Sequence, residues 1–137
     1  MNLLEKYINA WEKIETLILK QYQDRLITLA LFGSFARKEI HENSDIDIFM
    51  VVDPLPKLRF KRYEEFSELI DAPLQKEPWV PPLSPILKTK VEALQKPWYY
   101  LDLATESVLI VDKDNFFQNV LKEVREKMNQ WGTRKIG

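Results

Sequence analysis

The sequence contains no cysteine, only three glycines and a single histidine. Without cysteine there can be no disulfide framework, thiolate metal site or cysteine nucleophile. No apolar run approaches the length that spans a membrane. Acidic and basic residues interrupt the first residues of the chain, which is not the pattern of a secretory signal. We therefore expect a cytoplasmic protein with no membrane association.

An excess of charge of one sign is also missing, because the formal net charge at pH 7 is −1. A balanced composition produces no strong field toward a polyanion, so a nucleic-acid partner is not expected. The length of 137 residues suits one hydrophobic core and is too short for a second, substrate-binding domain. We expect residues 1–137 to form a single domain.

Hydrophobic periodicity predicts the order helix, strand, strand, helix, strand, helix, strand, helix. Apolar residues at helical spacing predict helices at residues 4–23, 58–70, 91–94 and 116–128. Short apolar runs predict strands at residues 26–32, 46–52, 83–87 and 108–111. Pro85 would confine the third of these strands to an edge or an irregular position of the sheet. This order predicts an α/β (α+β) fold with a small mixed sheet flanked by helices.

A glycine–serine pair follows the first predicted strand. Gly33 allows the sharp turn that the chain needs at this point. Ser34 is predicted to be the N-cap of a short helix at residues 35–39, whose free backbone N–H groups suit a phosphate. Arg37, one turn later, is placed to reach an outer phosphate oxygen. Strand, turn and cap also occur together without any ligand, so this element alone does not decide the function.

An aspartate pair opens the second predicted strand. Asp45 and Asp47 are two residues apart and project to one face, while Ile46 and Ile48 point to the other. Adjacent carboxylates repel each other, and burying either is costly unless a cation compensates the charge. Oxygen ligands of this kind suit Mg²⁺ that bridges substrate phosphates. The alternative is an exposed strand end at which Asp45 caps a turn.

The two elements together resemble the signature of the minimal nucleotidyltransferases, in the superfamily that includes DNA polymerase β. Gly33-Ser34, ten residues at 35–44 and Asp45-Ile46-Asp47 match its pattern of Gly-Ser, spacer and Asp-x-Asp. The resemblance implies a polymerase β palm-like fold in which the Gly-Ser pair holds ATP or another nucleoside triphosphate. It also implies that Asp45 and Asp47 are catalytic and bind Mg²⁺. The implied reaction is attack of an acceptor hydroxyl on the α-phosphate, which transfers AMP and releases pyrophosphate.

One departure from the family pattern leaves an alternative open. Active members usually carry a third carboxylate on a later strand, and the predicted strand at 83–87 has none. Glu77 is a weak candidate for that role. The alternative function is an antitoxin-like or regulatory nucleotide-binding protein, paired with a small helical HEPN-type partner and weak in transfer. An apolar patch on the first or last helix would also suit a homo-oligomer. A free-standing aminoglycoside-type or nucleic-acid-type transferase is less favoured.

Four other features have plain structural interpretations. His41 is expected to be a solvated loop residue. The basic residues between 57 and 62 are expected to form a charged, solvated helix face. The aromatic run Trp98-Tyr99-Tyr100 is expected to close the core. The short basic segment at residues 131–135 is expected to fray, and the sequence suggests no role for it.

Overall fold

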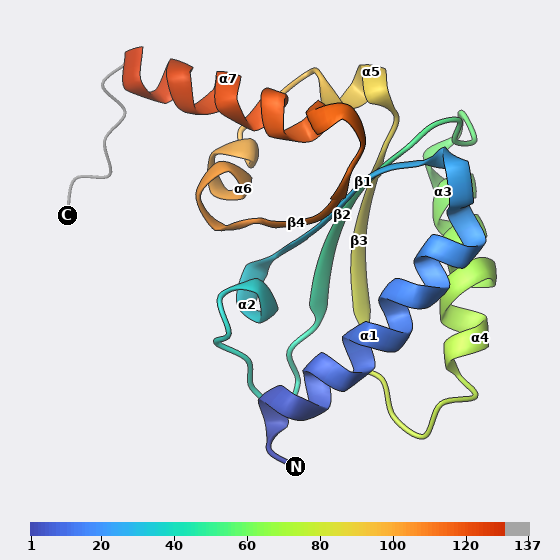
Figure 1. Ribbon diagram of the computed structural model, residues 1–137. Helices are drawn as coiled ribbons and strands as arrows, with labels where there is room; N and C mark the ends of the chain where they lie inside the picture. The colour runs from blue at the N-terminus through green and yellow to red at the C-terminus, as the bar shows by residue number, and fades with distance from the viewer. Residues whose placement is uncertain (131–137) are drawn as a thin grey trace.

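The computed structural model describes residues 1–130 and contains one four-stranded sheet with helices on both faces (Figure 1). The strands are β1 Leu26–Phe32, β2 Ile46–Val52, β3 Leu83–Lys88 and β4 Val108–Asp112. The helices are α1 Leu3–Tyr22, α2 Gly33–Ala36, α3 Arg59–Phe66, α4 Ala72–Leu74, α5 Lys90–Ala93, α6 Tyr100–Glu106 and α7 Phe116–Gln130. Shorter turns are η1 Gln23–Arg25, η2 Ser67–Asp71 and η3 Lys113–Asn115. The basic segment at residues 131–135 lies outside the described residues.

The sheet is mixed, as the sequence predicts. Its strand order is β3-β2-β1-β4, in which β1 is antiparallel to β2 and to β4, and β2 is parallel to β3. The proline-containing strand β3 is an edge strand, where Pro85 removes no hydrogen bond that a central strand would need. The backbone N–H of Leu87 donates to the hydroxyl of Tyr63 at 3.4 Å, so a side chain of α3 covers part of this edge.

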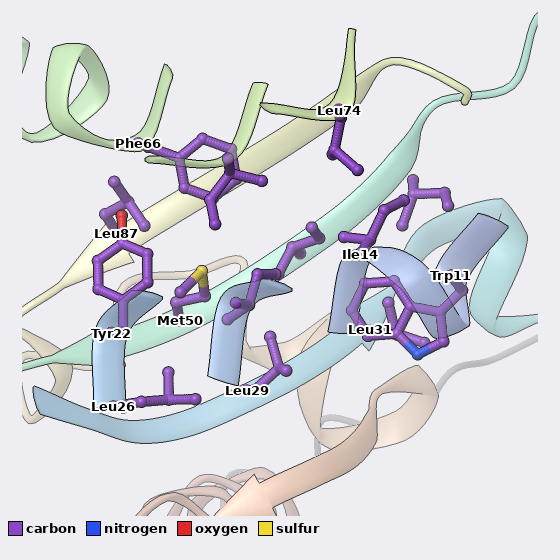
Figure 2. Close-up of a cluster of buried hydrophobic side chains, with 14 of the residues drawn as sticks. Trp11, Ile14, Tyr22, Leu26, Leu29, Leu31, Met50, Phe66, Leu74 and Leu87 are labelled. Carbon is purple, nitrogen blue, oxygen red and sulfur yellow. The ribbon is translucent and has the colours of Figure 1, made fainter. Parts of the chain in front are cut away.

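Helices cover both faces of the sheet, and each face has its own hydrophobic cluster. Helices α1, α3 and α4 pack on one face, and Figure 2 shows Tyr22, Phe66 and Met50 meeting there. Helices α5, α6 and α7 pack on the other face, where the ring of Phe49 stacks on Phe117 at 4.6 Å between centroids. Strand β2 contributes residues to both clusters, so both of its faces are covered.

The helical segments depart from the prediction in two places. The helix predicted at 58–70 continues through the π turn η2 into α4, which contains Pro73. Helix α6 was not predicted, because seven residues with only Tyr100 and Leu103 buried give too short a pattern. The expected aromatic core is correct for Tyr100 and wrong for Trp98, whose exposed fraction is 79%.

The basic stretch after β2 also departs from the prediction at one residue. Lys57, Arg59 and Lys61 are exposed, as expected of a solvated face. Arg62 is buried instead: it pairs with Glu92 at 2.6 Å. Its Nε also donates to a backbone carbonyl at 2.6 Å. Arg62 lies one helical turn before the core residue Phe66, so α3 presents both side chains on the same face.

Within the described part of the chain, no helix combines the length and the apolar character needed to cross a bilayer.

Candidate nucleotide and metal site

The sheet brings the glycine–serine pair and the aspartate pair together. Phe32, the last residue of β1, lies opposite Asp47 in the antiparallel register with β2. The chain therefore leaves β1 through Gly33 beside the point where β2 begins. Gly33 has a φ of +72°, and a Cβ built on it would lie 2.0 Å from Oδ2 of Asp47. Glycine is required here both for the backbone conformation and for the close approach of the carboxylate.

The two carboxylates of the motif lie close together at the start of β2. Asp47 is half-buried, while Asp45 precedes the strand and is exposed. Burial raises the pKa of Asp47, the negative charge of Asp45 raises it further, and Arg37 opposes both effects. Among residues 1–130, no ion pair includes either carboxylate. Such an uncompensated pair of hard oxygen ligands suits a divalent cation.

The turn after Gly33 differs from the prediction. Helix α2 begins at Gly33 and ends at Ala36, so Ser34 is its second residue and Phe32 takes the cap position. The predicted N-cap role of Ser34 and the predicted span 35–39 are therefore wrong. The helix is a single turn. After it, the backbone N–H of Glu39 donates to the Ser34 carbonyl at 2.9 Å, a bond between residues five apart that does not continue the α-helical pattern. Only a small dipole is expected from four residues, so Ser34 would meet a phosphate through its hydroxyl and backbone N–H.

Arg37 lies just after α2 and is held by two carboxylates. Its Nε lies 3.2 Å from Oε2 of Glu39, and its guanidinium lies 3.0 Å from Oε2 of Glu106. Glu106 is the last residue of α6, and sequence reasoning missed it because α6 itself was not predicted. A phosphate approaching Arg37 would have to replace one or both of these carboxylates.

The structure identifies the residue that lies beside Asp47 on the parallel strand. Ser84 of β3 is aligned with Asp47, and aligned residues of parallel neighbours point to the same face. Glu77, the weak candidate for a third acid, forms an ion pair with Lys13 of α1 at 2.8 Å and is not part of the site. Residues 1–130 contain no group of three or more histidine, cysteine or acidic side chains that could hold a metal. The protein ligands available here are therefore two carboxylates.

The loop between α2 and β2 is ordered by its own hydrogen bonds. The backbone N–H of His41 donates to Oγ of Ser44 at 2.8 Å, and the backbone N–H of Ser44 returns a bond to the His41 carbonyl at 3.0 Å. The side chain of His41 is exposed, as expected, and its Nδ1 accepts from the backbone N–H of Asn43 at 3.3 Å. His41 therefore shapes the loop and has no contact with the carboxylate pair.

Comparison with known proteins assigns this arrangement to a family. The model of the nucleotidyltransferase domain matches residues 12–105, which include the turn and both aspartates. The chain belongs to the nucleotidyltransferase domain family. A candidate protein adenylyltransferase of Methanocaldococcus jannaschii is 27% identical over 126 residues, 90% of this chain and 80% of that protein. A second one from the same organism is 39% identical over 62 residues, 45% of this chain and 59% of that protein.

Solved structures show the same fold for this nucleotidyltransferase. A chain from a toxin–antitoxin complex with AMP-PNP superposes with a TM-score of 0.53 and 18% identity, covering 91% of this chain and 92% of its own. A candidate nucleotidyltransferase from Sulfolobus solfataricus superposes with a TM-score of 0.52 and 19% identity. The match covers 81% of this chain and 85% of that protein. A third match is a chain from a complex of a tri-AMPylated HEPN toxin of Shewanella oneidensis with MNT antitoxin. It superposes with a TM-score of 0.51 and 16% identity, covering 93% of each chain.

Proposed function

We propose that the protein transfers AMP from ATP to a hydroxyl of a protein acceptor. The observation that carries the proposal is the meeting of the Gly33 turn with Asp45 and Asp47, where the central strand β1 ends and the central strand β2 begins. A new bond forms between the acceptor oxygen and the α-phosphorus, and the bond to the oxygen that leads to the β-phosphate breaks. Pyrophosphate leaves, and the acceptor proton passes to solvent. The descriptions of the relatives as adenylyltransferases support AMP as the transferred group.

Each residue of the site has a proposed role in this reaction. Gly33 leaves the space in which the Asp47 carboxylate lies against the turn. Ser34 would donate hydrogen bonds to the triphosphate, and Arg37 would exchange its carboxylate partners for a phosphate oxygen. Asp45 and Asp47 would hold Mg²⁺, which their unpaired charges fit. When bound, Mg²⁺ supplies charge stabilisation at the attacking and leaving oxygens.

We further propose that the acceptor is a small helical protein of the HEPN type, in the cytoplasm. Structural neighbours described as toxin–antitoxin complexes, one of them with an AMPylated HEPN toxin, support this partner. The antitoxin-like alternative, with binding but weak transfer, is favoured by a single observation: Ser84 stands beside Asp47 where a third carboxylate would lie.

The test is a transfer assay with a small helical protein of the HEPN type as the acceptor. We expect a mass increase of one AMP on the partner when ATP and Mg²⁺ are present, and none with the Asp47→Asn variant. Transfer by that variant at the wild-type rate would contradict the proposal. Ser84→Asp separates the two alternatives: faster transfer would show that a missing acid limits the wild type, and an unchanged rate would show that two carboxylates suffice.

A further inference from the structure

A buried tyrosine of α1 lies between the two halves of the site. The side chain of Tyr7 has an exposed fraction of 0%. Its ring lies 6.0 Å from Phe35 of α2, the residue after Ser34, and 5.3 Å from Trp79, which precedes β3. Tyr7 therefore packs against the phosphate turn on one side and against the segment that leads into β3 on the other.

The hydroxyl of Tyr7 binds the loop that leads to the aspartates. It donates to the carbonyl of Ser44 at 2.6 Å, a short bond, and lies 3.4 Å from the carbonyl of His41. Ser44 immediately precedes Asp45, and the loop from His41 to Ser44 is closed by its own hydrogen bonds. The Tyr7 hydroxyl therefore ties a preformed loop to α1 next to the first carboxylate.

The two aspartates depend on this tie to different extents. Asp47 lies within β2, where Phe32 of β1 and Ser84 of β3 flank it in the sheet. Asp45 lies before the strand begins at Ile46, and its C-terminal side is held by the bond from the Ile46 N–H to the Pro82 carbonyl at 3.0 Å. Its N-terminal side is held by the backbone of Ser44, to which the Tyr7 hydroxyl donates. Losing that hydroxyl would displace Asp45 and leave Asp47 in place.

We propose that Tyr7 is a positioning residue of the site, which holds the loop before Asp45 so that both carboxylates face one cation. The proposal rests on the proposed function, because it assumes that Asp45 and Asp47 bind a metal together. It adds a residue from α1, outside the motif, whose hydroxyl acts through the loop backbone and touches neither substrate nor metal.

The test compares two tyrosine-to-phenylalanine variants of the same helix. Tyr22 is also in α1, has an exposed fraction of 1%, and its hydroxyl has no hydrogen-bond partner in the described residues. Mn²⁺ binding is measured by electron paramagnetic resonance titration with AMP-PNP present. We expect Tyr7→Phe to weaken Mn²⁺ binding about tenfold, the equivalent of one lost hydrogen bond. Tyr22→Phe is expected to bind as the wild type does.

The outcomes separate this proposal from the proposed function. Unchanged Mn²⁺ binding by Tyr7→Phe, or equal weakening in both variants, would overturn the role of Tyr7 alone. No Mn²⁺ binding by the wild type would overturn the proposed function, and the role of Tyr7 with it. If Tyr7→Phe does not fold, Ser44→Ala serves in its place. It removes the bond from the His41 N–H but keeps the Tyr7 bond to the Ser44 carbonyl, so Mn²⁺ binding close to that of the wild type is expected; a tenfold loss would mean that the loop's own bond, and not Tyr7, positions Asp45.

A kinetic measurement adds a readout that a purely structural role would not move. In the transfer assay, we expect Tyr7→Phe to need more Mg²⁺ for half-maximal rate and to approach the wild-type rate at saturating Mg²⁺. Excess metal compensates for a displaced ligand, and because metal binding also favours the folded state, the comparison is made on a variant shown to be folded without metal. A lower rate that no Mg²⁺ concentration restores would contradict the positioning role.

Discussion

The acidic side chains near the two ends of β2 differ in whether a positive charge pairs with them. Beyond the C-terminal end, Arg62 pairs with Glu92 at 2.6 Å and donates to the carbonyl of Pro56. The bond from Arg62 lowers the pKa of Glu92 to about 2. At the N-terminal end, burial and the neighbouring charge of Asp45 raise the pKa of Asp47. The surroundings of Glu92 therefore favour its charged form, and those of Asp47 disfavour it.

This difference separates a structural role from a binding role. A carboxylate with a lowered pKa stabilises the fold at neutral pH, whereas one with a raised pKa destabilises it there. A fold gains nothing from a repelling pair of carboxylates at a strand end unless a ligand compensates them. We therefore interpret the C-terminal end of β2 as part of the scaffold and the N-terminal end as the site.

The largest effect is expected from the aspartate pair. Asp45→Asn or Asp47→Asn should slow transfer about a thousandfold or more, because the metal loses a charged ligand. The same substitutions should leave the metal-free protein as stable as the wild type or more stable, because the repulsion disappears. Rates and thermal unfolding midpoints, both on purified protein, measure the two effects.

A control for this prediction is a third aspartate with satisfied oxygens. Asp112 accepts hydrogen bonds from Thr28 and from the backbone N–H groups of Phe117 and Gln118, at 2.7 to 2.9 Å. Asp112→Asn should therefore destabilise the protein by about 1–2 kcal/mol. Equal destabilisation by all three substitutions would contradict the contrast between the two kinds of acid.

The next effect is expected at the glycine of the turn. Gly33→Ala would place a methyl group on the Asp47 carboxylate and would hold alanine at a φ of +72°. We expect a loss of about 2 kcal/mol in the free energy of unfolding, together with loss of Mg²⁺-dependent ATP binding. Denaturant unfolding and calorimetry measure these. Ala36→Gly, at the other end of α2, is the control that should keep ATP binding.

A comparable loss of stability, without loss of binding, is expected at the scaffold end. Glu92→Gln should lower the free energy of unfolding at pH 7 by about 2 kcal/mol, because it leaves Arg62 buried without its partner. The pKa of Glu92 falls from 4.5 to about 2, so its contribution is present above pH 4.5 and is lost as the pH falls toward 2. The free energies of unfolding of the wild type and of Glu92→Gln should therefore converge as the pH falls from 4.5 to 2. A constant difference down to pH 2 would contradict the assignment.

The smallest effect is expected at the arginine that changes partners. Arg37→Gln should weaken ATP binding about tenfold through loss of a charged hydrogen bond. Glu106→Gln releases one of the two carboxylates on Arg37 and should leave ATP binding equal or tighter. Calorimetric titration of ATP into both variants measures these two changes in affinity. Weakening by Glu106→Gln would mean that the carboxylate orients Arg37 and does not compete with phosphate.

The sequence predicts those parts of the molecule that local patterns record. Apolar runs predict the strands, and the spacing between Gly33 and Asp45 predicts the candidate site. The contacts that complete the site join distant residues: 37 positions separate Tyr7 from Ser44, and 69 separate Arg37 from Glu106. No periodicity or motif encodes such pairs, because they depend on how the elements pack.

The same limit explains the errors in the prediction. The short α6 has too few buried residues to show a helical period. Arg62 belongs to a stretch of basic residues that are otherwise exposed, and its burial depends on Glu92, 30 positions away. The alignment of Ser84 with Asp47 follows from the parallel pairing of β2 and β3, and the sequence does not fix that register.

The measurement that tests the account most directly is a calorimetric titration of ATP, with and without Mg²⁺, on the wild type and on Asp45→Asn. We expect the wild type to bind ATP only when Mg²⁺ is present, and Asp45→Asn to lose that binding while its fold stays intact. Equal ATP binding by both proteins, or none by a folded wild type, would contradict the claim that the N-terminal end of β2 is a metal and nucleotide site.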